Sequence, residues 1–115
     1  MHALIIEQDA FTVIMIEDIL RQVGFTSFDV ACSGAEASAA AGHRCPDLIT
    51  SALRLGSEFA IDAVEALCAD NEIAVVYVTS TSWQVRERVA GAVVVQKPFR
   101  PIDLETAVQV ATARL

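Results

Sequence analysis

The sequence has few basic residues and no long apolar run, and each shortage excludes a class of protein. Eight lysine and arginine residues stand against fifteen acids, which gives a net charge of −7. This charge repels a phosphate backbone and argues against nucleic acid as a direct partner. The longest apolar runs, such as Ile73 to Val78, have about six residues, far below the ~20 that span a bilayer. We therefore expect no membrane-spanning segment.

Cysteine is also scarce, with three residues, Cys32, Cys45 and Cys68. They are odd in number, widely spaced and contain no Cys-x-x-Cys pair, so they predict neither a disulfide framework nor a zinc site. Buried, reduced thiols are the simplest prediction. The stretch from Met1 to Glu7 lacks a cationic segment followed by a long apolar one, so it does not resemble a secretion signal. We therefore expect a cytoplasmic protein.

The length and composition predict one domain over residues 1–115. A chain of this size buries roughly two-thirds of its unfolded surface in a single core. Five short apolar segments alternate with five helical patterns. The strands are expected at Ala3 to Ile6, Phe25 to Cys32, Asp47 to Leu53, Ile73 to Thr79 and Ala92 to Gln96. The helices are expected at Ala10 to Gln22, Ser33 to about Ala41 with Gly42 closing it, Glu58 to Ala69, Thr81 to Val89, and from Pro101 to the end.

This alternation predicts an α/β fold with a parallel sheet covered by helices on both faces. Short loops and right-handed crossovers favour the flavodoxin-like strand order 2-1-3-4-5. The fourth helix should be short or irregular, because Ser82, Trp83 and Val85 are poor helix formers. The carboxyl ends of the strands then converge on one crevice. It would be formed by Glu7, Gln8, Asp9, Ala52, Thr79, Ser80, Lys97 and Pro98.

Four segments of the chain, in this order, resemble the receiver domain of bacterial response regulators. They are L-I-I-E-Q-D, P-D-L-I-T-S-A-L-R-L, V-V-Y-V-T-S and V-V-Q-K-P-F, and the resemblance extends over all 115 residues. It implies a site in which acids after strand one and a phospho-accepting Asp after strand three bind Mg²⁺. It also implies a hydroxyl residue and a lysine that contact the phosphoryl group, positions matched here by Thr79 and Lys97. Glu7 matches the first acid.

Three family positions carry a different residue in this chain. Gln8 replaces the second acid, Ala52 stands where the phospho-accepting Asp belongs, and Val94 occupies the aromatic switch position. Alanine has no lone pair with which to attack phosphorus. With Glu7 as the one remaining charged ligand, Mg²⁺ binding is not expected, so we predict no cofactor and no metal. The site charge changes from about −2 to about 0, so the site needs no cation for neutrality.

Several of these side chains also have structural interpretations. Asp9 could restore a metal site, but a residue directly before a helix is more typical of an N-cap. Ser51 could serve as a substitute acceptor, although strand alternation points it away from the face that Ala52 uses. Thr79 and Ser80 could bind a ligand or hydrogen-bond nearby backbone. Lys97 should pair with Glu7, and the family pattern makes Lys97-Pro98 a candidate cis peptide.

The first helix carries more apolar residues than one face can bury. Phe11, Ile14 and Met15 lie outside the stripe that should face the sheet. A surplus of this kind marks a protein interface, either with a partner or with a second copy of the chain. The alternative is that the last helix covers it.

Taken together, the residues and the resemblance predict an atypical pseudo-receiver of a two-component phosphorelay. We expect it to act as a phosphorylation-independent protein interaction module and not as an enzyme. Two other functions stay open. One is a divergent phosphoryl-transfer domain that uses another acceptor, and the other is a small-ligand sensor in the vacated crevice.

Overall fold

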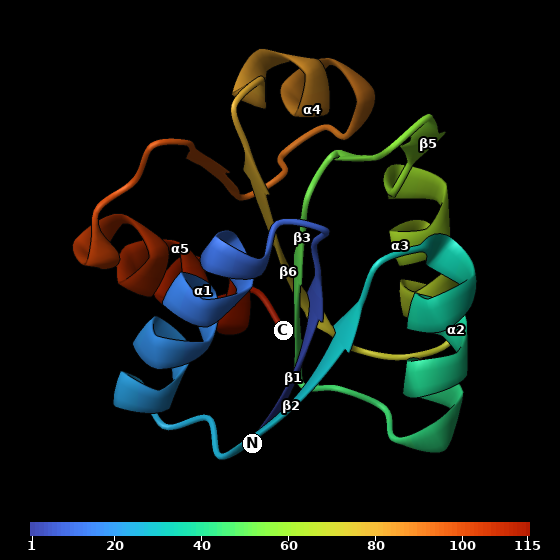
Figure 1. Cartoon of the computed structure of the whole chain (residues 1–115), viewed down its shortest axis with the longest axis horizontal. Coiled ribbons are helices and arrows are strands. Elements are labelled where there is room, and N and C mark those ends of the chain that lie inside the picture. The colour runs from blue at the N-terminus through green and yellow to red at the C-terminus, as the bar shows by residue number, and fades with distance from the viewer.

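A five-stranded parallel sheet forms the centre of the computed structural model, which describes residues 1–115. The strand order β2-β1-β3-β6-β7 confirms the predicted order 2-1-3-4-5, since β6 and β7 are the fourth and fifth strands of this sheet (Figure 1). The bounds are β1 His2–Ile6, β2 Ser27–Ala31, β3 Leu48–Ser51, β6 Ala74–Thr79 and β7 Val94–Gln96. All neighbouring strands run parallel, so their carboxyl ends meet at one edge.

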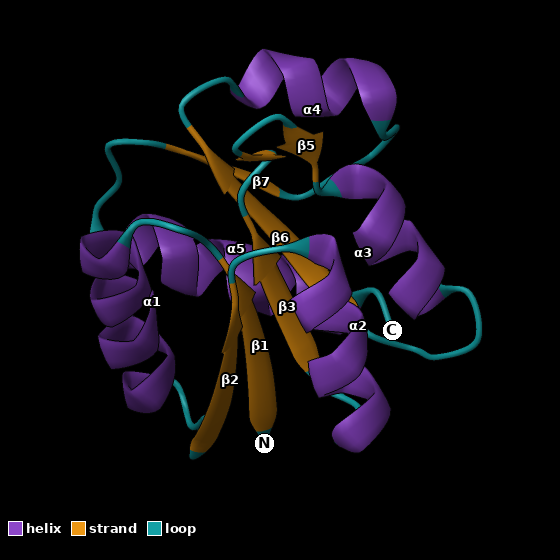
Figure 2. Cartoon of the chain, turned by 45° about the vertical axis from the view of Figure 1, so that its right-hand side comes forward, coloured by secondary structure: helices purple, strands orange, loops and turns teal.

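Helices cover both faces of the sheet, as predicted (Figure 2). Helices α1 (Ala10–Gln22) and α5 (Pro101–Ala113) lie on one face, and α2 (Gly34–His43) and α3 (Ile61–Cys68) on the other (Figure 1). Helix α4 (Ser82–Arg88) has seven residues and lies above the carboxyl ends of the strands, which confirms the predicted short fourth helix. A bilayer span would need a longer and more apolar helix than any in this structure.

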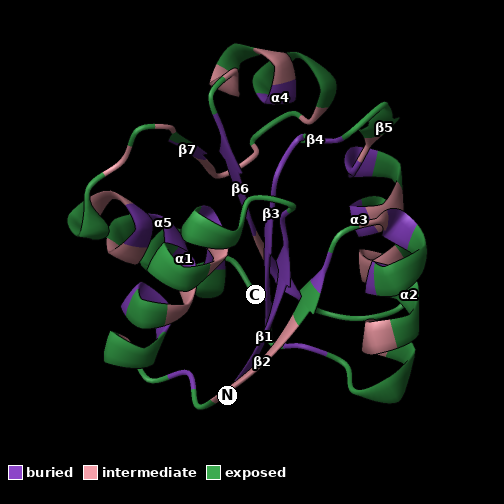
Figure 3. Ribbon diagram, in the orientation of Figure 1, coloured by how far each residue is buried: buried purple, intermediate pink, exposed green.

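The core has two layers, one on each side of the sheet. Ile5 and Val76 pack with α1 and α5 in one layer, while Leu4, Ile49 and Val64 belong to the layer beneath α2 and α3. Adjacent strand residues such as Leu4 and Ile5 therefore point into different layers. Burial on both faces explains why the central strands β1, β3 and β6 are nearly continuous apolar runs, whereas the edge strand β2 is only partly buried. Figure 3 shows this buried sheet between helices whose outer faces are exposed.

The region after β3 differs from the predicted helix over Glu58 to Ala69. A small antiparallel hairpin, β4 (Arg54–Leu55) with β5 (Glu58–Phe59), precedes α3, which begins at Ile61. Gly56 has φ +66°, a conformation that suits glycine and allows the tight turn. The backbone N–H of Ala60 then donates to Leu53 O at 2.9 Å and closes the hairpin onto the end of β3. At the other predicted boundary, Gly42 lies inside α2 instead of ending it.

The prediction of buried thiols is wrong, since none of the three cysteines is fully buried. Cys32 and Cys45 are exposed, Cys68 is half-buried, and all three are free. Cys32 lies between β2 and α2, and Cys45 lies between α2 and β3, in loops at the surface where no helix covers them. Burial raises the pKa of the Cys68 thiol, with smaller contributions from Cys45 and Glu65.

Thr50 on β3 has a side-chain oxygen that is fully enclosed and has no hydrogen-bond partner. It is 1% exposed and its neighbours in the sheet are Ile5 and Val76. An unpaired buried hydroxyl costs about 1 to 3 kcal/mol, so Thr50→Val should raise the free energy of unfolding by about 1 kcal/mol. Urea denaturation measures this change. Thr79→Val is the control and should lower stability, because the N–H of Thr81 loses its acceptor; a loss of stability in Thr50→Val would contradict the prediction.

Candidate functional site

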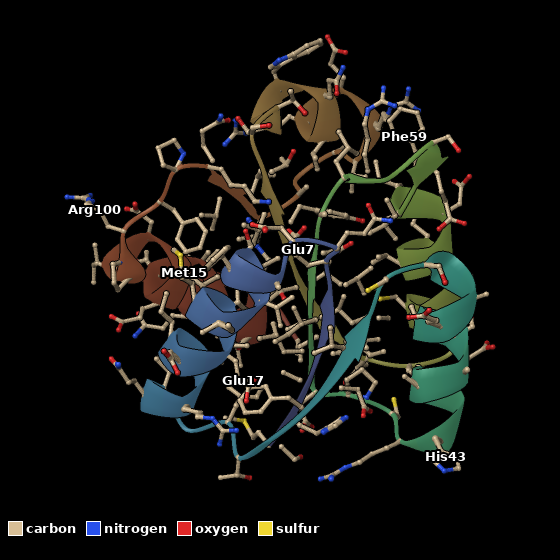
Figure 4. All side chains as sticks on the ribbon, viewed as in Figure 1. Glu7, Met15, Glu17, His43, Phe59 and Arg100 are labelled. Carbon is tan, nitrogen blue, oxygen red and sulfur yellow. The ribbon has the colours of Figure 1, made fainter.

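Glu7 and Lys97 form an ion pair at the carboxyl end of the sheet, as predicted. Glu7 follows β1 and is 6% exposed, and Lys97 Nζ lies 2.9 Å from its Oε1. The other carboxylate oxygen, Oε2, accepts the backbone N–H groups of Gln8 at 3.0 Å and Asp9 at 3.1 Å. Figure 4 shows Glu7 at this end of the strands. The carboxylate is therefore neutralised and hydrogen-bonded by the chain itself.

Ala52 lies in the crevice beside this ion pair. It follows β3, is 7% exposed, and its N–H donates to Ile6 O at 2.9 Å, which holds it against the end of β1. The crevice has a volume of about 310 Å³ and is lined by Glu7, Ala52, Thr79 and Lys97 among others. The structure thus brings together the residues at four strand ends that the sequence placed in one site. The end of β3 therefore presents a methyl group to this crevice.

Gln8 does not line the crevice. Its side-chain amide Nε2 instead donates to Cys32 O at 3.3 Å, in the loop that follows β2. An amide oxygen is a weaker magnesium ligand than a carboxylate, and the amide group of this side chain is bonded to a neighbouring loop. No three His, Cys, Asp or Glu side chains are grouped so that they could hold a metal ion. The absence of Mg²⁺ binding stays a prediction.

Asp9 is the N-cap of α1, which confirms its structural interpretation. Its Oδ2 accepts from Thr12 Oγ1 at 2.6 Å and from Thr12 N at 3.3 Å. The hydrogen bond from the Thr12 hydroxyl is the main reason that the pKa of Asp9 is lowered, and burial opposes it. One carboxylate oxygen of Asp9, Oδ2, is thus engaged at the start of the helix.

The hydroxyl groups of Thr79 and Ser51 are also engaged locally at this end of the sheet. Thr79 Oγ1 accepts the N–H of Thr81 at 3.1 Å, so the local interpretation of this hydroxyl is confirmed. Ser80 is exposed, and its carbonyl oxygen accepts from Gln96 Nε2 at 2.6 Å. Ser51 is 1% exposed and its Oγ donates to Ala52 O at 2.8 Å, which leaves no route for a phosphoryl donor.

The loops around α4 are held by contacts that the sequence did not indicate. The guanidinium groups of Arg54 and Arg88 lie 4.2 and 4.4 Å from the centre of the Phe59 ring. Phe59, labelled in Figure 4, belongs to the unpredicted hairpin, so this link between the hairpin and α4 was missed. At the other end of α4, Gln96 Oε1 accepts the N–H of Ser82 at 3.1 Å.

The residues on and directly after β7, the fifth strand of the main sheet, have the predicted geometry. The peptide bond between Lys97 and Pro98 is cis. Val94 pairs with Tyr77 on β6 and is half-buried. Valine has no ring, so the rotamer change implied for an aromatic residue at this position has no counterpart here.

No protein-family model matches the sequence, and no curated protein matches it. Solved structures do match the fold. The receiver domain of the Erythrobacter litoralis response regulator PhyR superposes with a TM-score of 0.87 at 24% identity, covering 96% of this chain and 88% of that one. Vibrio cholerae CheY4 gives a TM-score of 0.79 at 20% identity, covering 96% and 97%.

A longer protein contains the same fold as one part. The anti-anti-sigma factor PhyR from Bartonella quintana matches with a TM-score of 0.82 at 23% identity, and the match covers 98% of this chain. It covers 47% of the PhyR chain, so this chain spans about half the length of that protein. These likenesses show the fold, a five-stranded parallel sheet in the order 2-1-3-4-5 that is covered by helices on both faces. The chain has the flavodoxin-like fold of the response regulator receiver domains.

Proposed function

We propose that this chain is a pseudo-receiver that binds a protein partner without being phosphorylated at the usual position. The observation that carries the proposal is the pairing of Lys97 with Glu7 across a crevice in which Ala52 replaces the acceptor. In the family, this lysine contacts the phosphoryl group. Here Glu7 already neutralises Lys97, which supports a site that stays in one conformation. The site has no nucleophilic oxygen at position 52 and no vacancy that a cation must fill.

The contacts around α4 support a fixed conformation. Phe59 connects the hairpin to Arg88 on α4, and Gln96 connects the start of α4 to the end of β7. Lys97 is bonded to Glu7 directly after that strand. A segment held at both ends by such contacts has few alternative arrangements to adopt. The usual output face beside the fourth helix is therefore disfavoured as a switch.

Helix α1 offers the surface that the partner would contact. Phe11 is 80% exposed, Ile14 is 58% exposed and Met15 is 46% exposed, at the spacing of one helical stripe. A second stripe, which includes Ile16 and Leu20, packs into the core. Helix α5 therefore does not cover the apolar side chains of Phe11, Ile14 and Met15. We name the exposed stripe Phe11, Ile14 and Met15 the α1 patch.

The α1 patch continues into a groove beside the crevice. This groove has a volume of about 380 Å³, and its lining includes Met15, Ser80, Lys97 and Phe99. A partner that covers Met15 would therefore also reach the surroundings of Lys97. The likeness to PhyR, named as an anti-anti-sigma factor, supports binding to another protein. A partner with a complementary apolar surface is the proposed occupant, and a second copy of the chain is the alternative.

Intact mass measurement after incubation with acetyl phosphate and Mg²⁺ tests the absence of phosphorylation. We expect the mass to stay unchanged, because Ala52 cannot form the acyl phosphate and Ser51 is enclosed. A phosphate group mapped to any crevice residue would overturn the proposal. It would support the divergent phosphoryl-transfer function in its place.

Replacing Ile14 with Glu tests the α1 patch. A buried Ile side chain contributes about 1.5 to 3 kcal/mol, so the variant should weaken association at least tenfold. Light scattering measures self-association, and titration of the purified partner measures binding to it. Val110→Glu on α5 is the matched control, because Val110 is 42% exposed but does not belong to the patch. Unchanged binding, or loss of the monomer's own fold in Ile14→Glu, would contradict the assignment.

A further inference from the structure

A serine, a histidine and an aspartate are hydrogen-bonded in series at the amino end of the sheet. His2 begins β1, and its Nδ1 lies 2.8 Å from Ser27 Oγ, while its Nε2 lies 2.9 Å from Asp29 Oδ2. The histidine side chain is 5% exposed. His43 lines the same pocket as these residues, and Figure 4 shows it away from Glu7. The cluster is therefore separate from the crevice, which lies at the carboxyl ends of the strands.

Strand pairing places the three side chains on one face of the sheet. His2 is the partner of Ser27 in the parallel register of β1 and β2, and Asp29 lies two positions further along β2. The backbone of His2 is held on its other side by Asp47. Its N–H donates to Asp47 Oδ2 at 2.7 Å, and its carbonyl oxygen accepts the N–H of Asp47 at 2.8 Å. The imidazole is thus fixed between its two partners.

The hydrogen bonds assign a role to each ring nitrogen. A carboxylate can only accept, so the bond to Asp29 places the proton of the neutral imidazole on Nε2. Nδ1 is then an acceptor, and the Ser27 hydroxyl donates to it. A hydroxyl directed at a base, which is in turn oriented by a carboxylate, is the arrangement of an activated serine nucleophile. Such an arrangement is recognised by the geometry of its groups and not by their order in the sequence.

A pocket of about 520 Å³ gives a substrate access to this cluster. Ser27 is half-buried and lines the pocket together with His2 and Asp29. Short and apolar side chains form the remaining wall toward α2 and β2, namely Phe28, Ala39 and Ala40. This wall suits an acyl chain of a few carbons.

Arg44 adds a positive charge to the same pocket. It directly follows α2, lines the pocket, and takes part in none of the ion pairs of the structure. A free guanidinium can donate to a carbonyl oxygen as negative charge develops on it. The charges of Arg44 and Asp29 offset each other, which favours a substrate without net charge.

We infer that Ser27, His2 and Asp29 form a second reactive site, which hydrolyses neutral esters of short apolar carboxylic acids. Ser27 Oγ attacks the ester carbonyl carbon while its proton passes to His2 Nδ1, and the alcohol leaves with that proton when the carbon–oxygen bond breaks. Water then attacks the acyl-serine by the same route, which releases the carboxylic acid and restores the hydroxyl. Asp29 is a positioning residue that stabilises the imidazolium between these transfers.

The experiment uses two probes on the full chain. Diisopropyl fluorophosphate tests the nucleophile, because an activated serine forms an oxygen–phosphorus bond with it and expels fluoride. Intact mass counts the adducts, and peptide mapping locates them. Hydrolysis of p-nitrophenyl butyrate, followed by release of nitrophenolate, gives kcat and KM. Ser57→Ala is the matched control, because Ser57 is an exposed serine in the turn between β4 and β5.

We expect one adduct per chain, on Ser27, which Ser27→Ala abolishes and Ser57→Ala retains. Asp29→Asn should lower kcat about a hundredfold with little change in KM, because an asparagine amide can donate to Nε2 and so shift the ring proton to Nδ1. A residue that only supports the fold would not separate kcat from KM in this way. Arg44→Ala should lower kcat about tenfold.

Three results would overturn the inference: no adduct in the wild type, an adduct on the exposed His43 or on Ser57 in place of Ser27, or equal kcat in Asp29→Asn. Far-UV circular dichroism checks that each variant is folded. If Asp29→Asn does not fold, the mapped adduct and its loss in Ser27→Ala still decide the inference. The acetyl phosphate test of the crevice is separate, so either proposal can fail without the other.

Discussion

Replacing Lys97 with methionine is expected to lower the free energy of unfolding by about 3 kcal/mol. The substitution leaves the Glu7 carboxylate in its enclosed position, with the N–H groups of Gln8 and Asp9 but without a countercharge. Glu7 has a side chain that is 7% exposed, so water cannot replace the lost ammonium well. Urea denaturation followed by circular dichroism measures the change.

Removing both charges together should restore most of the loss. In Glu7→Gln combined with Lys97→Met, no buried charge remains, and the amide oxygen can still accept the backbone N–H groups. The surface pair of Arg100 and Asp103, at 3.2 Å, is the matched control. Arg100→Met should change the urea midpoint only slightly, because both side chains of this pair are in contact with water. A loss below about 1 kcal/mol in Lys97→Met would show that the ion pair does not hold the loop after β7.

Combining Ala52→Asp with Gln8→Asp is expected to convert the chain into one that accepts a phosphoryl group. The first change supplies the nucleophilic oxygen beside Lys97, and the second supplies the missing acid next to Glu7. The site charge returns from about 0 to about −2, which favours Mg²⁺. Incubation with acetyl phosphate and Mg²⁺ should then add one phosphoryl group, detected by intact mass.

The same double variant should gain a thermal stability that depends on magnesium, whereas the wild type should not. A ligand stabilises a protein only through its affinity for the folded state, by about 2.7 kcal/mol at a concentration of 100 Kd. Ala52→Asn combined with Gln8→Asp is the control, because asparagine has nearly the shape of aspartate but no nucleophilic carboxylate. If the double variant folds and binds Mg²⁺ but gains no phosphoryl group, the missing acceptor is not the main reason that the wild type is not phosphorylated. The fixed contacts around α4 then become the explanation.

The sequence by itself determined the sheet and much of the crevice. Strand and helix periodicity is a local property, and right-handed crossovers leave few ways to order five parallel strands. Residues at the ends of parallel strands must converge, so the meeting of Glu7 with Lys97 could be predicted across 90 positions. Asp9 could be identified as an N-cap from the sequence, because Thr12, whose N–H it accepts, lies only three positions further along the chain.

Tertiary structure alone decided the features that depend on contacts between distant segments. The hairpin at β4 and β5 has two residues per strand, too few for a period, and Phe59 contacts Arg88 through a fold that no local pattern encodes. Cys32 and Cys45 are exposed because of which parts of the surface the packed helices leave uncovered. An open apolar groove of about 290 Å³ lies where α3, the loop before β7 and the end of α5 meet without filling the space. Such volumes result from packing in three dimensions, and a pattern of apolar residues along the chain does not contain them.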